Sequence, residues 1–150
     1  MTSSVVEAIA AGARSESTVW AAALKDAPDW EPVFSALAPD AVAIGLETVY
    51  EAYLVHYGRP RLFLAPDEDE AVLLGDYLYA HGLVRVAESG GVGAVRVLAD
   101  LISRCAALRA EGVDGDGDAW VDAARALGGA PDGDAVARAL ERHSARAALS

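Results

Sequence analysis

The stretch Glu68–Glu88, EDEAVLLGDYLYAHGLVRVAE, decides the fold that this sequence predicts. Its apolar residues point in nearly every direction around a helical axis, and a helix of that kind is covered on most sides. The acids at its start favour a helix N-terminus, because the helix dipole stabilises negative charge there. We therefore expect a helix over 68–88 that is buried against the rest of the chain or against a partner.

Helices are predicted on both sides of this stretch. Asp40 is a good N-cap for a helix with one apolar face that ends at Gly58-Arg59-Pro60. After Glu88, the run Ser89–Gly93 predicts a loop, and a further amphipathic helix reaches about Ala110. Shorter elements are predicted over 4–12, 16–25, 30–37 (a helix or turn), 118–127 and 134–149.

The fold class that follows is all-α, a helical bundle. The chain has 150 residues, the size of one domain, and 53% of them are hydrophobic. We expect a single domain that comprises short N-terminal helices (1–39), a central core (40–112) and C-terminal helices (113–150).

The charge balance limits the partners. Against 23 acidic residues there are 12 basic ones, a net charge of -11, which repels the phosphates of nucleic acids and anionic membranes. No run approaches the length of a membrane span, and the start lacks the pattern of a signal peptide, so we expect an acidic cytoplasmic protein. The single cysteine, Cys105, excludes a disulfide framework and is predicted to be a small buried hydrophobe.

Several other motifs carry little specific chemistry. The alternating acids of Asp114–Asp118 resemble the start of a calcium loop, but Ala119 and Arg125 stand where that loop needs glycine and glutamate, so a solvated turn is predicted. Gly90–Gly93 is predicted to be a plain turn between helices. A basic row on the last helix, Arg138, Arg142 and Arg146, fits either a solvated face or an acidic partner.

Three stretches in the middle of the chain follow one another at a characteristic spacing. Ala71–Ala80 is close to the pattern V-L-x-G-D-x-L-x-A, Val97–Ile102 follows it, and Ala110–Gly112 is similar to A-E-G-E. From Leu46 to Gly112 the chain thus resembles the trans-polyprenyl diphosphate synthases, the all-α enzymes that lengthen isoprenoid diphosphates. The resemblance makes residues 40–112 a prenyl-synthase-like core.

The chain departs from that family where the family carries D-D-x-x-D and then R-R-G-x-P. Gly58 and Pro60 keep the end of this pattern, while Glu47, Thr48 and Glu51 stand at the aspartates and His56 and Tyr57 at the arginines. Ionising an allylic diphosphate requires Mg²⁺ held by carboxylates. Glu47 and Glu51 share a helix face and are candidates for a degenerate metal site. No catalytic residue, metal or cofactor is assigned to this chain, and Mg²⁺ is expected on a catalytic partner.

The resemblance implies the short non-catalytic subunit of a heterodimeric bacterial polyprenyl synthase, which helps to shape the tunnel for the growing product. The candidates that would face the partner or the tunnel are Val72, Leu74, Tyr77, Leu78, Tyr79 and His81.

Two other functions remain open. The chain fits an independent, self-associating helical scaffold or binding protein with no prenyl-transfer role. It also fits an enzyme or lipid-binding protein that uses Glu47, Glu51 and His56 with a metal.

Overall fold

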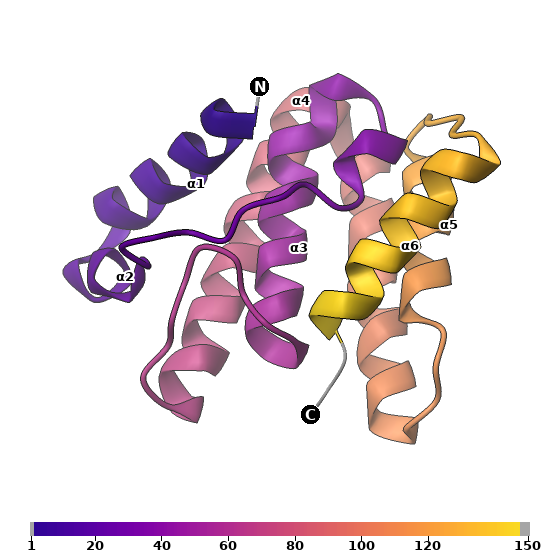
Figure 1. The fold of residues 1–150 in the computed structure, drawn as a ribbon. Coiled ribbons are helices and arrows are strands. Elements are labelled where there is room, and N and C mark those ends of the chain that lie inside the picture. Colours follow the sequence, from indigo (N-terminus) through magenta and orange to yellow (C-terminus); the bar gives the residue numbers. More distant parts are fainter. Residues whose placement is uncertain (1, 148–150) are drawn as a thin grey trace.

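A computed structural model describes residues 2–147, which form an all-α helical bundle, as the sequence predicts (Figure 1). None of its helices is long and apolar enough to cross a membrane. In chain order the elements are α1 (Thr2–Glu16), α2 (Thr18–Ala23), the 3-10 helices η1 (Ser35–Leu37) and η2 (Asp40–Val42), α3 (Ala43–Tyr57), α4 (Glu68–Glu111), α5 (Asp116–Ala126) and α6 (Gly133–Ala147).

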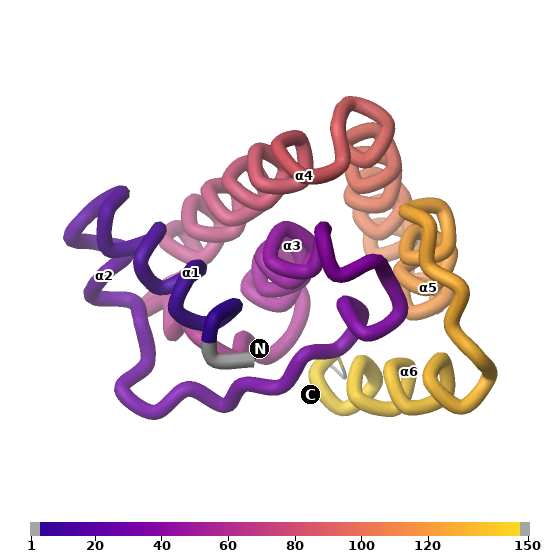
Figure 2. Tube along the Cα trace, turned by 90° about the horizontal axis from the view of Figure 1, so that it is seen from above, coloured from indigo at the N-terminus to yellow at the C-terminus, as the bar shows by residue number. Residues whose placement is uncertain are grey.

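Helix α3 lies in the middle of the bundle, with the other helices around it (Figure 2). Every residue from Gly45 to Leu54 is buried. The prediction of one apolar face is wrong here, because the polar residues that suggested a solvated side are satisfied inside the protein. Thr48, for example, donates its hydroxyl to the carbonyl of Ile44 at 2.6 Å.

Glycines allow α3 and α4 to approach each other closely. A Cβ atom on Gly45 would lie 3.2 Å from the carbonyl oxygen of Gly82, and one on Gly82 would lie 3.2 Å from the carbonyl oxygen of Gly45. Further along the same antiparallel pair, a Cβ on Gly75 would lie 2.4 Å from Nε2 of His56. The glycines of the 68–88 stretch are therefore contact points for α3.

Helix α4 consists of two helical segments that meet at Gly91. This residue has φ 76° and ψ −171°, a combination that is essentially restricted to glycine. The predicted loop over 89–93 is wrong, because the chain stays helical on both sides of this single residue. Figure 2 shows the second segment turning away toward α5, so that α4 borders α3 on two sides.

The N-terminal helices and two crossing loops cover one side of α3 and α4. Leu24 and Phe63 form an isolated antiparallel bridge, which pairs the loop after α2 with the loop after α3. The hydrophobic cluster beneath them contains Ile9, Ala13, Ala23, Ala52, Leu62, Phe63, Leu74 and Leu78. Helix α1 is longer than the predicted 4–12 helix, and α2 is shorter than the predicted 16–25 helix.

Helices α5 and α6 close the other side of α3 over a larger, aromatic cluster. Phe34 stacks on Trp120 with ring centroids 5.4 Å apart, and Tyr50 and Trp120 form a T-shaped pair with centroids 5.0 Å apart. Helix α5 begins at Asp116, two residues before the predicted start, and the predicted end of the last helix, Leu149, lies outside the described residues.

Candidate functional site

Glu47 and Glu51, the two metal candidates, face Arg61. Arg61 Nη1 lies 2.5 Å from Oε1 of Glu47, and Arg61 Nε lies 2.9 Å from Oε1 of Glu51. Backbone N–H groups occupy the remaining oxygens, since Glu47 Oε2 accepts from Val33 and Ser35, and Glu51 Oε2 accepts from Arg61 and Leu62. The carboxylates thus already have their donors.

The guanidinium of Arg61 is enclosed as well. Its carbon lies 4.0 Å from the centroid of the Trp30 ring, and all three charged side chains are at most 1% exposed. Burial by itself would lower the pKa of Arg61, but the charges of Glu47 and Glu51 outweigh burial and raise it. This arrangement, which we name the Arg61 centre, is a closed internal ion triad.

At these positions the two carboxylates pair with Arg61 and with backbone N–H groups. A divalent cation would have to displace a buried guanidinium and four backbone donors, and no group of three or more His, Cys, Asp or Glu side chains within residues 2–147 is arranged to hold one. Sequence reasoning missed Arg61, because it lies in the loop between α3 and α4, to which no motif was assigned. The signal that could have found it is the pair Glu47 and Glu51, one helical turn apart, with an arginine ten residues after the second glutamate.

His56 and Tyr57, at the positions of the family's arginine pair, provide no fixed positive charge. The ring of His56 stacks on Tyr79 at 5.2 Å, and its Nε2 lies 3.4 Å from a carboxylate oxygen of Asp76. Burial lowers the pKa of His56 despite that neighbour. Tyr57 lies beneath the guanidinium of Arg109 at 5.3 Å. His56 is therefore a packing residue of the α3–α4 contact.

The six partner or tunnel candidates on α4 do not share one surface. Leu74 and Leu78 are fully buried in the N-terminal cluster, and Tyr77 and Tyr79 are partly buried against it. Tyr77 lies between Trp20 and His81, with ring centroids at 6.1 and 5.3 Å. These side chains belong to the chain's own core and its margin.

The outer face of the same segment carries different residues. Leu73 and Val84 are 59% and 54% exposed, and the exposed Ala80 and Ala87 lie on the same side of the helix. We name these four residues the outer row of α4. Val72, the remaining candidate, is 51% exposed beside it. The sequence predicts that this helix is covered on most sides by the chain or by a partner; the chain covers the side of Leu74 and Leu78, and the side with the outer row and Val72 has no neighbour within residues 2–147.

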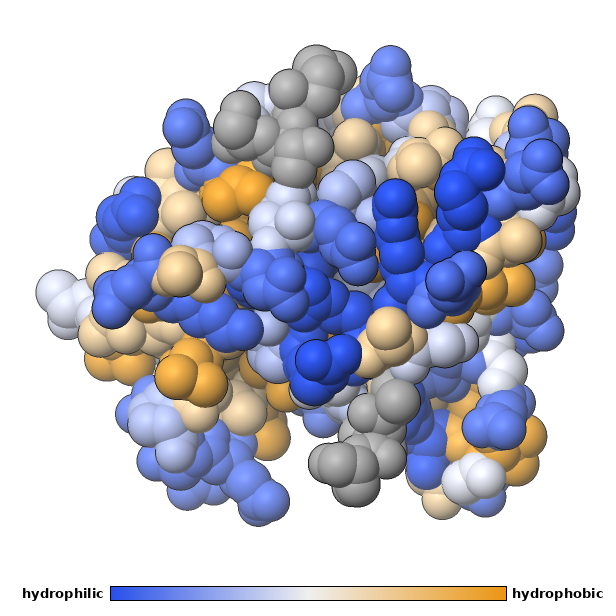
Figure 3. All heavy atoms as spheres, in the orientation of Figure 1, coloured by the Kyte–Doolittle hydropathy of each residue, from blue (hydrophilic) through white to orange (hydrophobic). Residues whose placement is uncertain are grey.

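Most of the basic row on α6 is hydrogen-bonded to other parts of the protein. The guanidinium of Arg146 is 6% exposed and donates to the carbonyl of Asp29 at 2.7 Å, and Arg142 donates to the carbonyl of Pro32 at 3.2 Å. Figure 3 shows hydrophilic residues gathered over α6 and the loop that crosses in front of α3. Two of the three arginines thus fasten α6 to that loop, although the side chain of Arg142 is still 43% exposed, and Arg138 is exposed as well.

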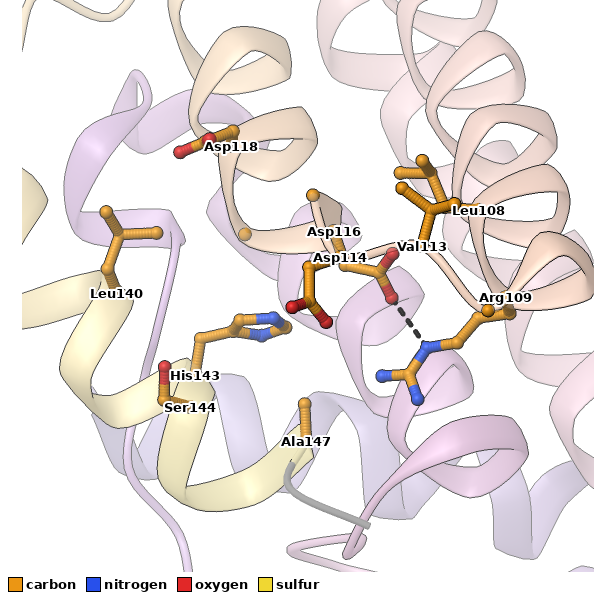
Figure 4. A pocket seen from close by; sticks show the side chains of 13 residues that line it. Leu108, Arg109, Val113, Asp114, Asp116, Asp118, Leu140, His143, Ser144 and Ala147 are labelled. Atoms are coloured by element: carbon orange, nitrogen blue, oxygen red, sulfur yellow. Dashed lines mark hydrogen bonds and ion pairs between the residues drawn. The ribbon is translucent and has the colours of Figure 1, made fainter.

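A cavity of about 680 Å³ lies where the end of α4, the start of α5 and the last turns of α6 meet (Figure 4). We name it the C-terminal cavity. Its polar lining is Arg109, Asp114, Asp116, Asp118, His143 and Ser144. None of the six candidates on α4 lines it, so it was not foreseen from the sequence.

Asp116 anchors the floor of the C-terminal cavity. Arg109 Nε donates to Oδ2 of Asp116 at 2.8 Å, and the hydroxyl of Tyr53 donates to the same oxygen. Burial, and next the hydrogen bond to Asp116, raise the pKa of Tyr53. The prediction of a solvated turn over Asp114–Asp118 is wrong at its centre, because Asp116 is only 7% exposed.

His143 forms the opposite wall. Its Nδ1 lies 2.8 Å from the hydroxyl of Tyr50 on α3, and the imidazole is buried among Phe34, Tyr50 and Tyr53. Burial lowers the pKa of His143 to about 4, so the ring is neutral at physiological pH. Asp116 on the floor and His143 on the wall are therefore both hydrogen-bonded to tyrosine hydroxyls of the central helix α3.

Comparison with known proteins finds no family model, no curated protein and no solved structure that matches this chain. The likeness to polyprenyl synthases accordingly rests on the sequence motifs, and the functional argument rests on the geometry described above.

Proposed function

We propose that this chain is a non-catalytic helical subunit, and that its partner is the larger, catalytic subunit of a polyprenyl diphosphate synthase. The observation that carries the proposal is the Arg61 centre. Glu47 and Glu51, at the family's aspartate positions, bind a guanidinium and backbone N–H groups. Prenyl-transfer chemistry needs carboxylates that are open to Mg²⁺ and diphosphate. A chain with this centre keeps a helical framework and leaves the chemistry to another polypeptide.

The outer row of α4 supports the association with a partner. Leu73 and Val84 are more than half exposed, and they are eleven residues apart, about 16 Å along the helix. Exposed aliphatic side chains that line one side of a helix are typical of a protein interface, whereas isolated ones are ordinary. The outer row lines neither the C-terminal cavity nor the smaller groove between α4 and α5. A product tunnel in such a complex would therefore form between the outer row and the partner.

The decisive experiment combines the purified chain with a catalytic polyprenyl synthase subunit that carries both aspartate-rich motifs and is encoded in the same genome. We expect a heteromeric complex in light scattering and a changed distribution of product chain lengths. The double variant Leu73→Glu/Val84→Glu should weaken the complex at least tenfold, about 1.4 kcal/mol, because charge would be buried at the interface.

The control is Val113→Glu, which places one such charge on a side chain of similar exposure, 51%, just beyond the C-terminal end of α4. It should bind and alter the products like the wild type. Unchanged products together with no complex would overturn the proposal. A stable homodimer of the chain that ignores the synthase would instead support the self-associating scaffold.

A further inference from the structure

The proposed function does not account for the C-terminal cavity. Its volume of about 680 Å³ is in the range of small-molecule sites. The end of α4, the start of α5 and the last turns of α6 build it, and no residue of the outer row lines it. Figure 4 shows the side chains of Asp114, Asp116 and Arg109 meeting His143 across this space.

The cavity favours positive charge. Three aspartates, Asp114, Asp116 and Asp118, line it together with one arginine, Arg109. Asp116 and Arg109 neutralise each other at 2.8 Å, and the exposed carboxylates of Asp114 and Asp118 remain. His143 adds no charge at neutral pH, because burial keeps its pKa low. The surplus of negative charge in a concave site attracts cations.

Two deeply buried side chains on the walls have unused polar atoms. The side chain of Asp116 is 8% exposed, and its Oδ1 accepts no hydrogen bond from residues 2–147. His143 is 6% exposed, and its Nε2 has no hydrogen-bond partner in the described part of the chain. A buried polar atom without a partner is rare, and Oδ1 of Asp116 is one, while Nε2 of His143 borders the same cavity from a separate helix. They indicate a missing hydrogen-bonding ligand.

An ammonium group matches these acceptors. It carries only donors, and Asp114 offers a carboxylate. His143 offers Nε2 as an acceptor in the tautomer whose Nδ1–H donates to Tyr50. Oδ1 of Asp116, buried just beneath the cavity surface, makes the electrostatic potential in the cavity more negative. Leu108 and Leu140 line the same cavity and suit an alkyl chain.

We infer that the C-terminal cavity binds a small alkylammonium ion, a primary amine whose charged head lies between Asp114 and His143 and whose apolar chain lies against Leu108 and Leu140. This binding is separate from association through the outer row of α4, so either can fail without the other.

The test is a titration of the full ¹⁵N-labelled chain with butylammonium chloride at constant ionic strength, followed in two-dimensional NMR spectra. We expect saturable shifts of the amide signals over 112–118 and 140–147. Asp114→Asn should weaken binding at least tenfold. This variant removes an exposed carboxylate and leaves the Asp116 contacts to Arg109 and Tyr53 in place.

The matched control is Asp26→Asn, which removes the same charge from an exposed position in the loop after α2 and should leave affinity unchanged. Sodium butyrate, with the same number of carbon atoms and a negative head, should not saturate the site. The absence of saturable shifts would overturn the inference and leave water as the occupant. Equal affinity in Asp114→Asn, or tighter binding of butyrate through Arg109, would overturn it as well.

Discussion

The guanidinium of Arg61 lies between two carboxylates and beneath the indole of Trp30, and it is fully buried. Burying such charges removes their hydration, so a buried ion pair is stable only when every charged atom finds a partner. Here the backbone of Val33, Ser35 and Leu62 completes the set around the glutamates. Removal of Arg61 would leave two buried carboxylates without a counterion. That cost is larger than the net stabilisation that the ion pairs themselves provide.

Replacing Arg61 with methionine should lower the free energy of unfolding by about 3–5 kcal/mol, because two buried carboxylates lose their counterion. Urea denaturation followed by circular dichroism measures the change. The triple variant Glu47→Gln/Glu51→Gln/Arg61→Met should regain at least half of the loss, since neutral amides need no counterion. An Arg61→Met protein within about 1 kcal/mol of the wild type would show that the triad contributes little.

His143 should make the fold sensitive to acid. Its pKa falls from 6.5 to about 4 on folding because of burial, while Asp116 and Arg109, which face it, act in opposite directions. The unfolded chain therefore binds the proton more tightly, and the contribution of His143 is complete above pH 6.5. It is lost as the pH falls from 6.5 to 4, by roughly 3 kcal/mol in total.

Stability curves between pH 4 and pH 7 for the wild type and His143→Gln isolate this contribution, because the carboxylates titrate in both proteins. The wild type should lose more stability toward pH 4 than the variant. Parallel curves would contradict the neutral, buried state of the imidazole.

At the level of the elements, the pairing of α3 with α4 depends on residues without side chains. Gly45 and Gly82 face each other, and Gly75 accommodates the ring of His56. A helical glycine weakens its own helix relative to alanine by roughly 0.5–1 kcal/mol. That weakness is offset by the close packing of two helices that provide most of the core.

Gly82→Ala should destabilise the protein by about 1–3 kcal/mol, since the added Cβ would lie 2.6 Å from Cγ2 of Val49 and 3.1 Å from its backbone nitrogen. Gly93→Ala is the control in the same helix. No atom lies within 4 Å of its added Cβ among the described residues, so it should stabilise by roughly 0.5–1 kcal/mol. Thermal unfolding of both variants measures the difference. Equal effects would contradict a close contact at Gly82.

The elements also differ in how well local patterns predict them. The helices around α3 and α4 follow from their apolar spacing and flanking glycine or proline. The break in α4 does not, because Ser89–Gly93 has the composition of a loop and only the φ of Gly91 reveals a single-residue turn. Likewise, α3 has the pattern of an amphipathic helix, and the burial of its glutamates depends on Arg61, which lies outside the helix in the loop that follows it.

At the scale of the whole molecule, two hydrophobic clusters share α3 and α4. Ala13 and Leu74 belong to the N-terminal cluster, and Trp120 and Ala124 belong to the C-terminal one. Tyr79 contacts both. Helices that cross from one cluster to the other couple their folding, because neither cluster can lose α3 without exposing the other.

We expect a single cooperative unfolding transition. In a urea titration followed by residue-resolved NMR, the native amide signals of Ala13 and Ala124, both fully buried, should vanish at midpoints within about 0.2 M of each other. Earlier loss of the Ala13 signal would show that α1 and α2 form a separate unit.

The sequence by itself determined the all-α class and the order of the main helices. These properties follow from local spacing, composition and residue identity. Tertiary structure alone decided that α3 is the enclosed helix, that Arg61 neutralises Glu47 and Glu51, and that Asp116 and His143 border one cavity. Each of these depends on contacts between different elements of the fold, and the free energy of burying a group depends on which groups surround it there.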